Sequence, residues 1–228
     1  SRGVDMFTIE QMTVGAWKAE CYALTNETGT IVLDPGAEPQ RILRWLGDKK
    51  VVGIILTHCH SDHIGAVNEL VEAYGCWVAC GAHDVDGVAD VHRSGFDEEG
   101  IDYTVDHVDR ALEEGDVVTW GGDSLTVLNT PGHTPGSICL LCEGQKVMFS
   151  GDMLFQGAIG STAFVLGNDA DMVRSCARLT ELDPALRVYP GHGGPTTMQA
   201  ELPMLAFIVQ RAMRAAPHNP SWREGSWW

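Results

Sequence analysis

Residues Thr57-His58-Cys59-His60-Ser61-Asp62-His63 decide how this chain is interpreted. They follow an apolar run over 51–56, which predicts a buried strand, and they precede a helical pattern over 65–74. His58 and His60 are two residues apart, so in an extended chain they point to the same side and can share one metal ion.

The next two polar residues, Asp62 and His63, turn with the start of the predicted helix and can face a second ion. Burying so many polar groups without a metal would leave several of them unsatisfied. Two residues of the segment also have a simpler explanation. Asp62 can serve only as a helix N-cap, and Cys59 alternates away from the ligand face as a packed thiol. The density of histidine nevertheless favours a metal site.

Three further polar segments also follow predicted strands. They are 130–137, which holds His133 on a turn with proline and glycine on both sides, 150–152, which ends in Asp152, and 189–194, which contains His192. The four strand ends supply an inventory typical of two divalent cations with nitrogen and oxygen ligands. The candidate ligands are His58, His60, Asp62, His63, His133, Asp152 and His192.

Short strands and a few helices alternate irregularly in both halves of the chain. Apolar, β-branched runs predict strands over 22–25, 30–33, 51–57, 77–79, 117–120, 125–128, 138–142, 146–149 and 186–189. Helical spacing appears over 40–46, 65–74, 170–182 and 198–214. This order predicts two packed sheets with helices on their outer faces.

The motifs H-x-H-x-D-H, G-H-T-P-G-S, G-D and P-G-H-G resemble those of the metallo-beta-lactamase superfamily over 25–192. The resemblance implies an α+β fold, a four-layer αβ/βα sandwich of two mixed β-sheets with outer helices. We expect residues 1–228 to form one such domain, including a C-terminal helix and a Trp-rich tail over 198–228.

The resemblance also implies ligand roles. His58, His60 and His133 would bind the first metal, Asp62, His63 and His192 the second, and Asp152 would bridge both. Zinc is the expected metal, with iron or manganese as alternatives, since histidine and carboxylate accept all three. Two ions that share a water yield a hydroxide at neutral pH, which predicts hydrolysis of an acyl bond in a small molecule. Besides ligation, Asp62 could steer protons.

The segment Gly151-Asp152-Met153-Leu154-Phe155 resembles the G-D-x-L-F of glyoxalase II-like (hydroxyacylglutathione hydrolase-like) proteins. That favours a thioester substrate such as an acylglutathione. Two departures weaken the match. Residues 160–163 read Gly-Ser-Thr-Ala instead of G-R-T-D, and the basic C-terminal region of those enzymes is reduced here to the predicted helix, where Arg211 and Arg214 are read as solvated.

Four alternatives to a glyoxalase II-like thioester hydrolase stay open from the sequence. A lactonase of the same superfamily would use the same seven ligands, and a beta-lactamase shares the fold. A persulfide dioxygenase would hold one iron on a subset of them, but the intact second-metal set and the missing G-R-T-D count against it. A scaffold that binds metal without catalysis would not need all seven ligands.

The amino-acid composition indicates which partners and which cellular environment suit the protein. Lys plus Arg is 15 and Asp plus Glu is 31, and the formal charge of −16 disfavours nucleic acid as a partner. No apolar stretch approaches the ~18–20 residues that cross a bilayer, and the polar N-terminus suits a cytoplasmic protein. Seven cysteines predict reduced thiols, although the pairs Cys76/Cys80 and Cys139/Cys142 could form a zinc knuckle. The sequence leaves the oligomeric state open.

Two irregular stretches and four side chains are further candidates for contact with a ligand or with protein. Residues 87–114 predict a long surface excursion, either a binding loop or a connector. The tail over 217–228 contains three tryptophans, which we expect to dock on protein. No catalytic role is assigned to the possible pocket residues His83, Tyr103, Phe155 and Phe164.

Overall fold

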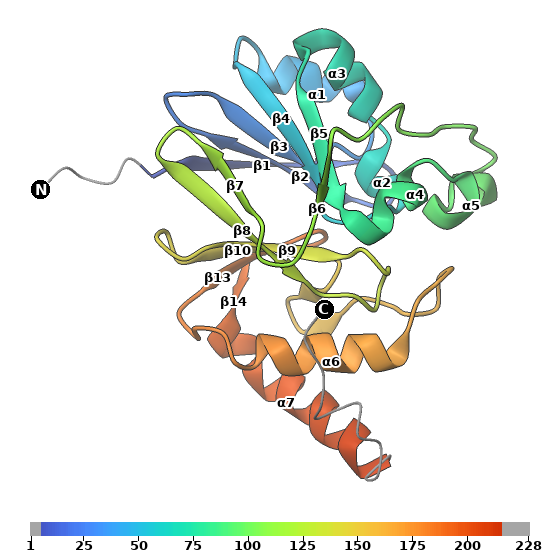
Figure 1. Cartoon of the computed structure of the whole chain (residues 1–228), viewed down its shortest axis with the longest axis vertical. Coiled ribbons are helices and arrows are strands. Elements are labelled where there is room, and N and C mark those ends of the chain that lie inside the picture. Colours follow the sequence, from blue (N-terminus) through green and yellow to red (C-terminus); the bar gives the residue numbers. More distant parts are fainter. Residues whose placement is uncertain (1–5, 216–228) are drawn as a thin grey trace, which may run out of the picture.

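Two six-stranded sheets pack face to face between two outer layers of helices (Figure 1). The computed structural model describes residues 6–215. Each sheet contains both parallel and antiparallel neighbours. The structure therefore confirms the four-layer αβ/βα sandwich that the sequence predicts.

The first sheet comes from the N-terminal half of the chain. Its strand order is β1 (Thr8–Val14), β2 (Ala19–Thr25), β3 (Thr30–Leu33), β4 (Val51–Leu56), β5 (Trp77–Gly81) and β6 (Arg110–Leu112). Helices α1 (Pro39–Leu46) and α3 (Val67–Tyr74) connect successive parallel strands. Their apolar residues, including Ile42 and Leu70, are buried in one hydrophobic cluster with the outward side chains of β4, including Ile54 and Leu56.

The second sheet follows in the C-terminal half. Its strand order is β14 (Thr196–Thr197), β13 (Arg187–Pro190), β10 (Val147–Gly151), β9 (Ile138–Cys142), β8 (Asp123–Asn129) and β7 (Val117–Trp120). Helices α6 (Asp169–Leu179) and α7 (Met198–Ala215) lie along its outer side, below the sheets in Figure 1. A short hairpin, β11 (Leu154–Phe155) and β12 (Ala158–Ile159), follows β10.

The two faces of the second sheet belong to different cores because successive strand residues point to opposite sides. In β9, Ile138 and Leu140 join the cluster between the sheets, where Phe149 and Tyr22 also lie. The intervening Cys139 and Leu141 join the cluster beneath α6 and α7. A strand buried on both faces reads as a continuous apolar run, as residues 138–142 do.

The expectation for residues 87–114 is only partly correct. The segment includes α5 (Val91–Ser94), the 3-10 turn η2 (Phe96–Glu99) and strand β6, and η1 (Ala82–Asp84) and α4 (Val85–Val88) lead into it. Phe96 and Val105 are buried in it. Short elements of three or four residues contain too few turns for apolar periodicity to show.

The structure also bears on the predictions for the cysteines, the C-terminal helix and membrane spans. All seven cysteines are buried and free, and the potential metal-binding groups among the described residues contain no cysteine. Arg211 and Arg214 are exposed on α7, as the solvated interpretation predicts. No helix within residues 6–215 combines the length and apolar character that a membrane span requires. The tryptophan tail over 217–228 lies outside the described residues.

Candidate metal centre

The polar motifs lie where strands end at one edge of the packed sheets. His58 follows β4, His133 follows β8, Asp152 follows β10 and His192 follows β13. Because β3 runs parallel to β4 and β10 runs parallel to β13, the carboxyl ends within each pair open at the same edge. Residues from distant parts of the chain thus reach one site.

All seven predicted ligands come together there in two groups. The ligand atoms of His58, His60 and His133 lie within 4.8 Å of one another, and so do those of Asp62, His63, Asp152 and His192. Asp62 and His63 belong to the short helix α2 (Ser61–Ile64), and the ring of His63 lies 4.3 Å from that of His58.

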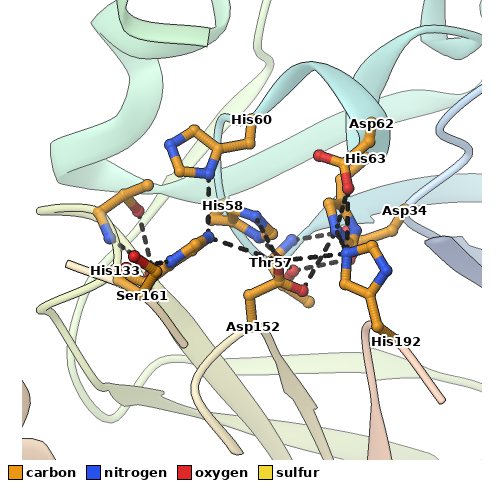
Figure 2. Close-up of polar contacts among 12 residues, drawn as sticks. Asp34, Thr57, His58, His60, Asp62, His63, His133, Asp152, Ser161 and His192 are labelled. Atoms are coloured by element: carbon orange, nitrogen blue, oxygen red, sulfur yellow. Dashed lines mark hydrogen bonds and ion pairs between the residues drawn. The ribbon is translucent and has the colours of Figure 1, made fainter. Parts of the chain in front are cut away.

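The carboxylate of Asp152 lies between the two groups (Figure 2). Its Oδ2 is 3.5 Å from Nε2 of His58 and 3.4 Å from Nε2 of His133. Its Oδ1 is 3.2 Å from Nε2 of His63, and Oδ2 is 3.4 Å from Nε2 of His192. One carboxylate therefore faces imidazoles of both groups.

Hydrogen bonds on the far side of the rings fix the tautomers of His63 and His192. Nδ1 of His63 lies 3.0 Å from Oδ2 of Asp34, and Nδ1 of His192 lies 3.2 Å from the carbonyl of Lys18. Carboxylate and carbonyl oxygens only accept, so in the neutral rings Nδ1 donates and Nε2 keeps its lone pair. These two Nε2 atoms face each other at 3.2 Å, where two lone pairs repel.

Hydrogen bonds also determine which ring nitrogen carries the proton in His58 and His133. Nδ1 of His133 donates to the Ser161 carbonyl at 2.6 Å. The hydroxyl of Thr57 donates to Asp34 at 2.6 Å, which leaves its oxygen to accept from Nδ1 of His58 at 3.0 Å.

This arrangement leaves acceptors in the middle of the site. Nε2 of His58 and Oδ1 of Asp152 are buried without a hydrogen-bond partner among the described residues. Burying unpaired acceptors is costly, and cations placed among them would satisfy them all. The residues fit a pair of divalent cations, and four of the five rings, those of His58, His63, His133 and His192, are oriented by a partner behind them.

Burial and charge set the protonation of these groups. Burial, reinforced by neighbouring imidazoles, lowers the pKa of His60 to about 3 and that of His58 well below its usual value. Burial raises the pKa of Asp152, but the nearby rings of His63 and His58 outweigh it and hold that pKa well below the usual range. His58 and His60 are therefore neutral beside an ionised Asp152, which are the forms that bind metal.

His63 and His192 differ from the other rings. Burial lowers the pKa of His192, but close contacts with the Asp152 and Asp62 carboxylates raise it to about 10. The same carboxylates raise the pKa of His63 against its own burial. In the metal-free protein, protons thus occupy nitrogens that cations would otherwise hold.

Sequence reasoning missed two buried carboxylates, Asp34 and Asp84. Asp34 follows β3 and orients His63 and, through Thr57, His58. Its place directly after an apolar strand is the one signal that could have found it.

Asp84 joins the two loops that carry the first group of ligands. It accepts hydrogen bonds from the backbone N–H of Cys59 at 2.9 Å, from the N–H of Gly136 at 2.8 Å and from the Thr134 hydroxyl at 2.6 Å. No local pattern marks this residue, because its partners come from loops far along the chain.

A cavity of about 470 Å³ opens onto the centre. Trp17, residues 92–95, Glu98 and Glu99 line one part, and residues 163–165 line another. The ring of Phe164 is 5.0 Å from that of His60, and Phe155 is 5.9 Å from His192. Of the other possible pocket residues, His83 is exposed away from the cavity lining, and the hydroxyl of Tyr103 accepts from Asn68.

The sandwich and the possible metal ligands at its edge are typical of a metallo-hydrolase superfamily. The family model of the metallo-beta-lactamase superfamily matches residues 14–192, and the chain belongs to that superfamily as a glyoxalase II-like member. Membership supports a metal-dependent hydrolase activity, and the superfamily binds divalent metals.

The chain is similar in sequence or structure to several known proteins. The chain is 30% identical to hydroxyacylglutathione hydrolase GloC of Haemophilus influenzae, over 90% of this chain and 99% of that protein. Two crystal structures also match. BLEG-1, a B3 metallo-beta-lactamase, has a TM-score of 0.82 and 28% identity over 88% of this chain and 99% of that one. TTHA1623 in a di-iron-bound form has a TM-score of 0.76 and 32% identity, over 84% of this chain and 96% of that one.

Proposed function

We propose that this protein is a two-metal hydrolase that cleaves acyl thioesters, acylglutathiones among them. The observation that carries the proposal is the convergence of seven donors at a cavity, with Asp152 between two groups of imidazoles. The likeness to a hydroxyacylglutathione hydrolase supports thioesters as the substrate class. Seven buried free thiols also suit the reducing environment expected of a cytoplasmic protein.

His58, His60 and His133 would hold one cation, Asp62, His63 and His192 the other, and Asp152 both. Such a pair supplies an activated water near neutral pH and polarises a carbonyl. We propose zinc as the native metal. The set contains only nitrogen and oxygen donors, which also accept iron or manganese, and TTHA1623 was crystallised in a di-iron-bound form.

The protein's own groups would then orient and transfer protons. Asp34, Thr57 and Ser161 keep the ring protons on the outer nitrogens, so the inner nitrogens stay free for ligation. Asp62 lies at the cavity, with 18% of its side chain exposed and its Oδ2 3.0 Å from Nε2 of His192. This position suits transfer of a proton between the site and solvent. A departing thiolate needs little help from an acid, because thiol pKa values lie near ~8.5.

Beta-lactam hydrolysis is the second candidate, favoured by the likeness to BLEG-1 across nearly its whole length. A lactonase would use the same ligands. The seven donors do not discriminate among these acyl substrates, so the discrimination depends on the cavity walls.

The test combines metal analysis with a substrate panel. Elemental analysis should find close to two metal ions per chain. S-lactoylglutathione and a simple aryl thioester should be hydrolysed faster than a set of lactones and nitrocefin. Turnover of lactones or nitrocefin without any thioester would refute the substrate class, and a single iron per chain would refute the two-metal centre.

A further inference from the structure

One wall of the cavity carries negative charge. We define the acidic wall as Trp17, Glu98 and Glu99, all of which line the cavity. Both glutamates are exposed, and within residues 6–215 neither carboxylate forms an ion pair with lysine or arginine.

The cationic side chains next to this wall are already engaged. Nη2 of Arg93 donates to the His83 carbonyl at 3.0 Å and lies 3.5 Å from the buried Asp84 carboxylate. Nδ1 of His92 is 2.9 Å from the Asp97 carboxylate. No lysine in the described part of the chain lines the cavity. At this wall, a substrate carboxylate would therefore meet two glutamates and, among the described residues, no unengaged lysine or arginine.

Trp17 adds an aromatic surface to the same wall. It lies in the turn between β1 and β2, is 66% exposed, and donates from Nε1 to Oε1 of Glu99 at 3.0 Å. This bond holds the indole beside the carboxylates, although the two residues are 82 positions apart. An indole face attracts cations through its quadrupole, and adjacent carboxylates reinforce that attraction.

The acidic wall shares its cavity with the candidate metal centre. Asp152 lines this cavity, is 8% exposed, and has a buried Oδ1 without a hydrogen-bond partner among the described residues. Because the acidic wall and this carboxylate line one cavity, a substrate held at the centre experiences the charge of the wall.

We propose that the acidic wall selects acyl substrates whose leaving group carries a positive charge, and that it disfavours anionic leaving groups. The proposal rests on the proposed function and narrows it. Glutathione has two carboxylates and one ammonium, so its thioesters should bind more weakly than those of a small aminothiol. The effect of one solvated charge is modest, about threefold to fivefold in kcat/KM at low salt.

The experiment varies only the charge of the leaving thiol. One acyl group is attached to thiocholine, N-acetylcysteamine or 3-mercaptopropionate, which are cationic, neutral and anionic; the quaternary nitrogen of thiocholine cannot take the acyl group from sulfur. The wild type should prefer them in that order. Glu98→Gln should flatten the order, and Glu98→Lys should favour the anionic thioester. Glu143→Lys is the matched control, because Glu143 is exposed beyond the end of β9 remote from His133.

A binding measurement gives a readout that does not depend on turnover. Titration calorimetry of the metal-loaded protein with cysteamine, mercaptoethanol and 3-mercaptopropionate should show the same order, altered by Glu98→Lys and not by Glu143→Lys. An order that is unchanged in Glu98→Lys, or tightest binding of the anionic thiol by the wild type, would overturn the proposal. If no thioester is hydrolysed but this binding order holds, the substrate class fails and the charge selection stands.

Discussion

The carboxylate of Asp34 accepts a hydrogen bond from Nδ1 of His63 at 3.0 Å in the interior of the protein. Both residues are buried, and they reach each other because β3 runs parallel to β4, with Leu33 opposite Ile55. Asp34 is thereby placed behind the ring of His63, and the inner nitrogen of that ring points toward Asp152.

We expect Asp34→Asn to weaken metal binding about 10- to 100-fold, the usual consequence of losing a carboxylate behind a histidine ligand. The amide keeps the size of the side chain but presents a neutral group to His63. Equilibrium dialysis followed by elemental analysis measures the change. Asp48→Asn, an exposed carboxylate after α1, serves as the control. Equal metal content in all three proteins would contradict the orienting role.

Asp152→Ala should lose most of the bound metal and nearly all hydrolytic activity, because one carboxylate faces both groups of imidazoles. The fold should survive, since the change empties a site at the edge of the sheets and leaves the three hydrophobic clusters intact. Circular dichroism checks the fold, and elemental analysis and a thioester assay check the site. Wild-type rates in this variant would remove Asp152 from the centre.

Gly191→Ala should disrupt the centre although it adds only a methyl group. A Cβ at Gly191 would lie 2.3 Å from Oδ1 of Asp152 and 2.9 Å from Cε1 of His63, so both side chains must move. Displaced ligands should reduce metal affinity about tenfold or more. Gly194→Ala is the matched control, because nothing lies within 4 Å of a Cβ there. Similar metal affinity in the two variants would show that the site tolerates the displacement.

The stability of the metal-free protein should be greatest near pH 6.5. Below that pH the unfolded chain protonates histidines that the fold keeps neutral. The pKa of His60 falls from 6.5 to about 3 on folding, so its contribution is lost as pH drops through this range. His192 has the opposite sign, because its pKa rises from 6.5 to about 10. Its contribution is complete below pH 6.5 and is lost as pH rises toward 10.

Denaturant unfolding at about pH 4.5, 6.5 and 9 measures this profile. With metal bound, the loss at alkaline pH should disappear, since a cation replaces the proton on Nε2 of His192. A free energy of unfolding that rises steadily from pH 4.5 to 9 without metal would show that His192 gains no proton on folding.

Local patterns predicted most of the regular structure. The runs over 30–33, 117–120 and 138–142 match β3, β7 and β9 in full, and the helical spacing over 198–214 matches α7 to within one residue. Strands β1 and β6 were not predicted. They are edge strands with several exposed residues, so neither shows a continuous apolar run.

The sequence by itself determined the class of fold and the identity of seven candidate ligands, because strand periodicity and the H-x-H-x-D-H spacing are local properties of the chain. Tertiary structure decided which donors face each other, which ring nitrogen carries the proton and which charges line the cavity. These features depend on pairs such as Lys18 with His192 and Trp17 with Glu99, which are 174 and 82 positions apart. A local pattern holds no information about such contacts, since they form only when the packed sheets bring distant loops to one edge.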